Sequence, residues 1–245
     1  MAWWEALLLV GGGLLAGTIN AVAGAGSILT VPLLVLAGVP GNDANGSNRV
    51  GILTSNAAAA VSFRRLGVRG LREASPILVP VVAGAIVGSL TIGRLTDDSF
   101  ERFFGFLVLP LVILAVRKPK VRVGTKPWST RATVAVFTAI GLYGGAVQAG
   151  IGLVLLAALT RTGYDLVTAN NIKVVVNLCI TTAALPIFIA RGEVDWIPAL
   201  VLAGGFTLGG WVGAHVAVKG GERFLRWAMV AAAVLLAGRL LGLYG

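Results

Sequence analysis

One apolar stretch near the start of the chain is too long, and too rich in glycine, to be a single straight membrane helix. Residues 11–37 carry no charged side chain. As one helix, these 27 residues would extend about 40 Å, against a hydrocarbon core of about 30 Å. The middle of the stretch reads GAGS at 24–27, and each glycine costs about 1 kcal/mol in a helix interior. We therefore predict a full span over 2–23, a break, and a short returning helix over 28–37 with Ser27 as its N-cap.

A break of this kind has structural and functional consequences. Backbone that leaves the helical conformation at membrane depth must be buried in protein or line a wet cavity. Broken helices of this type bind substrates and ions in secondary transporters.

The same pattern recurs in the second half of the chain. Three positions repeat at an offset of 128 residues: Gly13, Gly17 and Asn20 correspond to Gly141, Gly145 and Gln148. Three more repeat at an offset of 125: Gly38, Ala44 and Asn45 correspond to Gly163, Ala169 and Asn170. We predict a second span over 132–149, a break at 150–152 and a short helix over 153–160. A repeat with a break at the same place in each half indicates a transporter binding site.

The composition places the chain in a membrane. It has 245 residues, of which 57% are hydrophobic and only 12% charged, which is typical of a polytopic helical membrane protein. The net charge of +10 does not indicate nucleic-acid binding, because the charges lie between apolar runs. The single cysteine, Cys179, leaves no internal disulfide and no multi-cysteine metal site. We also find no phosphate loop, zinc-ligand pattern or Ser/His/Asp constellation, so we predict neither an enzyme nor a cofactor.

Loop charges predict the topology. Further helices are predicted over 44–63, 76–92, 103–116, 167–190, 197–218 and 227–244. Cytoplasmic loops carry the Lys/Arg excess, which places the loops 64–73, 117–131 and 219–226 inside and the loops 93–102 and 191–196 outside. The predicted fold is an all-α polytopic membrane protein of two inverted-topology repeats, 1–122 and 123–245. Each repeat holds a broken-helix hairpin and three further transmembrane helices, and the expected location is the inner (plasma) membrane.

Two basic residues stand at matching places after the breaks. Arg49 follows Asn45 by four residues, and Lys173 follows Asn170 by three, so each pair shares one helix face. Intramembrane cations that face a cavity attract an anion, and asparagine amides replace its water. The alternative is that each cation extends along its helix to the lipid headgroups. The matching placement in both halves favours the binding interpretation.

The two breaks supply further candidate residues. The short helices begin near Gly24, Gly26 and Ser27 in the first half and near Gly150 and Gly152 in the second, and a helix N-terminus binds anions. Asn20 and Gln148 lie on the incoming segments, where the alternative role is hydrogen bonding between helices. His215 can relay protons or serve a structural role. The candidate substrate-binding residues are Asn20, Gly24, Gly26, Ser27, Asn45, Arg49, Gln148, Gly150, Gly152, Asn170 and Lys173.

These segments resemble a known family. The strings GTINAVAGAGSILTVPLL with the following ANGSNR, and GLYGGAVQAGIGLVLLAALTRTGYDLVTANNIKVVV, are similar to the two repeats of the TauE/SafE sulfite exporter family. The resemblance implies duplicated multi-span halves and transport of sulfite, sulfoacetate or related small sulfur-containing anions, mostly outward.

The expected function is therefore secondary transport of a small sulfur-containing anion by alternating access around the two hairpin tips. A passive anion channel and a non-transporting membrane scaffold are the alternatives. The expected partners are the anion, the lipid bilayer and further copies of the same chain in a homo-oligomer, and no nucleic acid.

Overall fold

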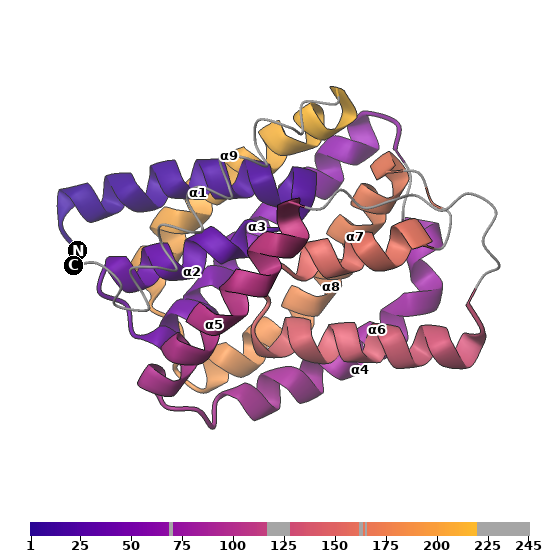
Figure 1. The fold of residues 1–245 in the computed structure, drawn as a ribbon. Coiled ribbons are helices and arrows are strands. Elements are labelled where there is room, and N and C mark those ends of the chain that lie inside the picture. The colour runs from indigo at the N-terminus through magenta and orange to yellow at the C-terminus, as the bar shows by residue number, and fades with distance from the viewer. Residues whose placement is uncertain (69–70, 117–127, 162–163, 165, 220–245) are drawn as a thin grey trace.

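The computed structural model describes residues 1–68, 71–116, 128–161, 164 and 166–219 of the chain (Figure 1). Within these residues the fold is all-helical, with nine helices and no strand. The helices are α1 (Trp3–Ala23), α2 (Ser27–Leu36), α3 (Gly41–Arg65), α4 (Leu71–Ile92), α5 (Asp97–Val116), α6 (Thr130–Ala146), α7 (Ile151–Arg161), α8 (Leu166–Ala190) and α9 (Trp196–Lys219). The helix predicted over 227–244, the turn at 220–226 and the central linker over 117–127 lie outside the described residues.

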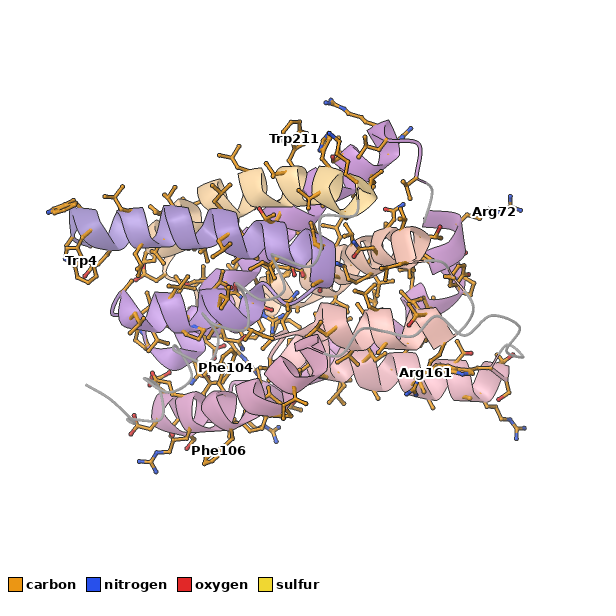
Figure 2. All side chains as sticks on the ribbon, turned by 45° about the horizontal axis from the view of Figure 1, so that its top comes forward. Trp4, Arg72, Phe104, Phe106, Arg161 and Trp211 are labelled. Carbon is orange, nitrogen blue, oxygen red and sulfur yellow. The ribbon has the colours of Figure 1, made fainter. Side chains whose placement is uncertain are left out.

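Four of the described helices are long and apolar enough to cross a membrane: Trp3–Ala23, Ala74–Ile92, Leu166–Ala190 and Trp196–Lys219. The outer surface is strongly apolar, because Val79, Phe106 and Ile197 are each about two thirds or more exposed. Figure 2 shows Phe106 pointing away from the bundle, whereas Phe104 on the same helix points inward and is buried. This distribution is that of a multi-pass membrane protein, whose apolar surface faces lipid.

The long helices pack in pairs from opposite halves of the chain. Helix α1 packs along α9, and α4 packs along α6 (Figure 1). Glycines allow the close approach: a Cβ at Gly17 would come within 2.2 Å of the Phe206 carbonyl oxygen, and one at Gly145 within 2.0 Å of the Ala85 carbonyl oxygen. Small residues at membrane helix interfaces let backbones approach in this way.

Helices α3 and α8 are the polar elements of the interior. Each runs for 25 residues, and the two pack against each other. Their buried positions include many polar side chains: Asn45, Ser47, Asn48, Arg49, Ser55 and Asn56 on α3, and Asn170, Asn171, Lys173, Asn177 and Thr181 on α8. Polar groups buried at membrane depth require partners inside the protein, and these two helices therefore position the candidate site.

The observed helix bounds correct some predictions. Helix α4 begins at Leu71, earlier than predicted, and holds Pro76 and Pro80 inside it. Helix α5 begins at Asp97, inside the predicted loop 93–102. Asp97 and Asp98 occupy its first turn, where carboxylates stabilise the positive end of the helix dipole.

Candidate functional site

The first break lies between α1 and α2. Helix α1 ends at Ala23, and Gly24 takes the left-handed conformation with φ 76°, donating its N–H to the Asn20 carbonyl oxygen. The chain then turns back, and α2 lies against α1. The close approach is visible at two glycines: a Cβ at Gly26 would lie 2.3 Å from the Ala16 carbonyl oxygen, and one at Gly12 would meet the Leu33 side chain. Ser27 is the first helical residue of α2 and makes no capping bond, so its predicted role as N-cap is wrong.

The second break lies earlier than predicted. Helix α6 ends at Ala146, and α7 already begins at Ile151. Gln148 and Gly150 both take the left-handed conformation, with φ of 64° and 61°. The predicted break at 150–152 is therefore wrong by several residues, and Gln148 lies within the break and not on the incoming helix. A left-handed glutamine is strained, and surrounding contacts must hold it.

The two breaks touch each other. A Cβ built on Gly24 would lie 2.4 Å from the Gly152 Cα, and one built on Gly152 would lie 2.3 Å from the Gly24 Cα. The Ser27 hydroxyl donates to the Gln148 carbonyl oxygen at 3.0 Å and accepts from the Gly150 N–H at 3.3 Å. Ser27 thus pairs the Gly150 N–H, and it gives a second hydrogen bond to the Gln148 carbonyl oxygen, which also accepts from the Ile151 N–H at 3.3 Å.

Arg49 on α3 caps the end of α6. Its side chain is fully buried, and its guanidinium donates to the carbonyl oxygens of Gly144, Gly145 and Ala146 at 3.2, 2.6 and 3.1 Å. The guanidinium also lies 4.1 Å from the ring centre of Phe188 on α8. A cation at a helix C-terminus is stabilised by the negative end of the helix dipole. The buried Arg49 side chain does not extend to the headgroups.

Lys173 on α8 makes the corresponding contact with α1. It is fully buried, and its Nζ donates to the carbonyl oxygens of Asn20 and Ala21 at 2.8 and 3.1 Å. Each cation therefore caps a helix from the other half of the sequence. We call this arrangement reciprocal capping.

Gln148 joins the second break to both polar helices. Its Oε1 accepts from the Arg49 guanidinium at 2.9 Å. Its Nε2 donates to Asn177 Oδ1 at 3.1 Å and to Thr181 Oγ1 at 2.5 Å, both on α8. These three bonds hold the left-handed residue in place. Neither Asn177 nor Thr181 was among the predicted site residues, although Asn177 lies one turn beyond Lys173 on the same face of α8.

Several buried polar atoms around the breaks have no hydrogen-bond partner among the described residues. Asn45 donates its Nδ2 to the Ala146 carbonyl oxygen at 2.9 Å, but its Oδ1 is unpartnered. Asn48 accepts from the Thr30 hydroxyl at 2.5 Å, but its Nδ2 is unpartnered. Arg49 Nε and Asn170 Oδ1 are unpartnered as well. Since buried polar groups are normally hydrogen-bonded, these atoms are available to a ligand or to water.

Two loops, one between α8 and α9 and one between α4 and α5, cover the start of α3. Ser47 accepts from the Asp195 N–H at 2.8 Å, and Asn42 binds Asp97 Oδ1 and the Leu95 carbonyl oxygen at 2.9 Å each. A Cβ at Gly46 would lie 1.7 Å from the Glu193 carbonyl oxygen. The loop between α8 and α9 therefore contacts α3 directly, one turn before Arg49.

Glu193, in the loop between α8 and α9, interacts electrostatically with Arg49. Burial raises the pKa of its carboxyl above the ordinary value, and Asp43 and Asp97 add to the shift, whereas Arg191 and Arg49 oppose it. One of its carboxylate oxygens is buried and has no partner among the described residues.

The predicted residues fall into one connected region. Gly24, Gly26, Gln148 and Gly150 lie in the two breaks, and Ser27 and Gly152 lie in the first turns of the helices that follow them. Asn20 lies in the last turn of α1, and Asn45, Arg49 and Lys173 bind the helix ends beside the breaks. Asn170 lies one turn before Lys173 on α8. His215 lies elsewhere, between Ser62 on α3 and the Trp211 carbonyl oxygen on its own helix. Among the described residues no group of His, Cys, Asp and Glu is arranged to hold a metal ion.

Comparisons with known proteins find relatives that are named as membrane transporters. The profile of the sulfite exporter TauE/SafE family matches residues 9–240. A probable membrane transporter protein, ORF9, of Sinorhizobium sp. is 29% identical over 233 residues, covering 93% of this chain and 88% of that protein. A probable membrane transporter protein of Haemophilus influenzae is 26% identical, covering 93% and 91%. The probable membrane transporter protein YfcA of Escherichia coli K12 is 25% identical, covering 93% and 86%.

No solved structure matches this chain. The family profile spans both breaks and both buried cations, and this chain therefore belongs to the sulfite exporter TauE/SafE family.

Proposed function

We propose that this membrane transporter carries a small sulfur-containing anion, such as sulfite or an organosulfonate, across the inner membrane, mostly outward. The observation that carries the proposal is the pair of fully buried cations, Arg49 and Lys173, each bound to a helix end beside the two touching breaks. The family name points to sulfite.

The charge balance of the region supports an anionic substrate. A helix C-terminus carries roughly half a negative charge, so the ends of α1 and α6 together offset about one of the two positive charges of Arg49 and Lys173. About one positive charge is left among buried groups, where ions are costly unless they are paired. A bound anion of one negative charge would balance it.

The proposed mechanism is alternating access between two inverted repeats. In this proposal each repeat is a hairpin, α1–α2 or α6–α7, followed by further helices, and the anion binds where the hairpin tips meet. Because the two breaks touch through Gly24 and Gly152, binding requires the breaks to separate. Movement of one hairpin-bearing unit against the rest would then open the site to one side at a time.

The test is exchange of radiolabelled sulfite into proteoliposomes preloaded with unlabelled sulfite, with and without a pH gradient. We expect accelerated exchange in the wild type and none in Arg49→Ala or Lys173→Ala, because each variant removes a cation and leaves a helix end uncapped. The control is that both variants are recovered as inserted, monodisperse protein. Wild-type rates in both variants would refute the assignment.

The same vesicles separate a carrier from a passive anion channel. A carrier exchanges labelled for unlabelled substrate faster than it allows net flux, whereas a channel shows no such counterflow. Net flux without acceleration by internal substrate would favour the channel.

A further inference from the structure

Helix α3 has several buried polar atoms without hydrogen-bond partners near Arg49, and their donor or acceptor character bears on which ligand fits. Three side chains on adjacent turns of α3 are fully buried, and each leaves one polar atom without a partner among the described residues: Asn45 Oδ1, Asn48 Nδ2 and Arg49 Nε. Residues three and four apart lie on the same face of a helix. Asn45 and Arg49 therefore share the face of α3 that binds the end of α6, and Asn48, one turn after Asn45, faces Thr30 of α2.

A shared acceptor brings two of these groups together. The Ala146 carbonyl oxygen accepts from Asn45 Nδ2 at 2.9 Å and from the Arg49 guanidinium at 3.1 Å. The Asn45 amide and the Arg49 guanidinium therefore lie on either side of a single oxygen atom. The third group, Asn48, is fixed by the Thr30 hydroxyl of α2.

The unpartnered atoms differ in kind. Asn48 Nδ2 and Arg49 Nε carry N–H groups and can only donate, whereas Asn45 Oδ1 can only accept. A fully ionised oxyanion, which has acceptors alone, would satisfy the two donors and leave Asn45 Oδ1 unpaired. A ligand that has both acceptor oxygens and one O–H would satisfy all three.

The second half repeats the acceptor. Asn170 stands one turn before Lys173, and its Oδ1 is also buried without a partner among the described residues. Each buried cation therefore has an unpartnered amide oxygen one turn away on its own helix.

We infer that the site takes a singly protonated oxyanion with one negative charge, whose O–H donates to Asn45 Oδ1 while its other oxygens accept from Asn48 and Arg49. This inference rests on the proposed function, and it adds that hydrogen sulfite, and not the sulfite dianion, is the transported form. The single negative charge also matches the surplus of about one positive charge beside the breaks.

The experiment compares two anions of equal charge that differ in the O–H. Hydrogen sulfite, HO–SO2⁻, has one hydroxyl, and methanesulfinate, CH3–SO2⁻, has a methyl group in its place. Initial rates of exchange would be measured for both in proteoliposomes, at a pH below the second pKa of sulfurous acid, so that hydrogen sulfite predominates. We expect the wild type to prefer hydrogen sulfite by about tenfold in Vmax/KM, the effect of one buried hydrogen bond.

The variant Asn45→Leu keeps the branching of the side chain and removes the acceptor. It should lower transport of both anions, because the bond to Ala146 is lost, but it should lower transport of hydrogen sulfite about ten times more. Asn45→Ala removes the same acceptor without adding volume, and it carries the test if Asn45→Leu does not fold. The control is Thr182→Val on α8, whose exposed hydroxyl bonds only to the Leu178 carbonyl oxygen of its own helix. This variant should transport both anions as the wild type does.

The outcomes are distinguishable from failure of the proposed function. If the wild type moves neither anion, the proposed function fails for this substrate class. If it moves both, and Asn45→Leu and Asn45→Ala leave the ratio of the two efficiencies unchanged, the inference about the proton is overturned. A water molecule would then be the partner of Asn45 Oδ1.

Discussion

The contact between the two breaks predicts a large difference between two identical substitutions. In Gly152→Ala the new Cβ would lie 2.3 Å from the Gly24 Cα and 2.5 Å from the Gly24 carbonyl oxygen, whereas ordinary contacts begin near 3.4 Å. Both obstacles are backbone atoms, which cannot rotate away, so the breaks must move apart by about 1 Å. Overpacking of a tight site costs about 1 to 3 kcal/mol, and here we expect the upper end of that range.

The gain in helix propensity reduces this cost. Replacing glycine by alanine in a helix contributes about 1 kcal/mol of stability, which leaves a net loss of about 2 kcal/mol for Gly152→Ala. Gly204→Ala on α9 is the matched control, because nothing lies within 4 Å of its Cβ position, and it should gain the full contribution of about 1 kcal/mol.

Thermal unfolding of the purified protein in detergent measures the difference. For a chain of this size each kcal/mol corresponds to about 2 to 4 °C in Tm. We expect Gly152→Ala to unfold about 4 to 8 °C below the wild type and Gly204→Ala about 2 to 4 °C above it. Equal Tm values for the two variants would show that the two breaks do not touch, and the site geometry would have to be abandoned.

Three further predictions concern the same region. Ser27→Ala should lower the unfolding free energy by about 1 to 2 kcal/mol, because it leaves the buried Gly150 N–H without a partner, whereas the Gln148 carbonyl oxygen keeps its bond from the Ile151 N–H; a change in unfolding free energy below a few tenths of a kcal/mol would contradict the bridging role. Gln148→Gly should be more stable than Gln148→Ala by about 1 to 2 kcal/mol, because both lose the side-chain bonds but only alanine keeps the left-handed strain; the reverse order of Tm would be evidence against strain. The raised pKa of Glu193 means that its protonated form favours the folded state, so its contribution is present below the ordinary carboxyl value of 4.5 and is lost as pH rises through the folded pKa. As the pH rises from acid to neutral, the Tm of Glu193→Gln should therefore fall less steeply than that of the wild type. Parallel curves of Tm against pH would contradict this contribution of Glu193.

The glycines of the first break carried enough information to locate it. Glycine is the residue that takes a left-handed conformation at little cost, and Gly24 takes it at the end of α1. At the second break the same reasoning selected Gly150 and Gly152, but the helix had already ended at Ala146. The residue that turns the chain there is Gln148, and its conformation is maintained by side chains of α3 and α8 that are distant in sequence.

The roles of the two cations show a similar limit. Spacing along the chain placed each cation on one face with an asparagine, and both were predicted to bind an anion. Their hydrogen bonds to the ends of α6 and α1 depend on how the two halves of the chain pack together, and residue spacing along the sequence does not predict that packing. Their part in anion binding, like the inverted topology, stays a prediction.

Reciprocal capping also bears on whether either half of this chain can exist alone. A polypeptide ending before residue 117 would contain Arg49 but not the carbonyl groups of Gly144, Gly145 and Ala146 that accept its hydrogen bonds. It would contain the end of α1 but not Lys173. The second half would have the converse deficiency, so either half alone would leave its buried arginine or lysine without the carbonyl acceptors that it has in the full chain.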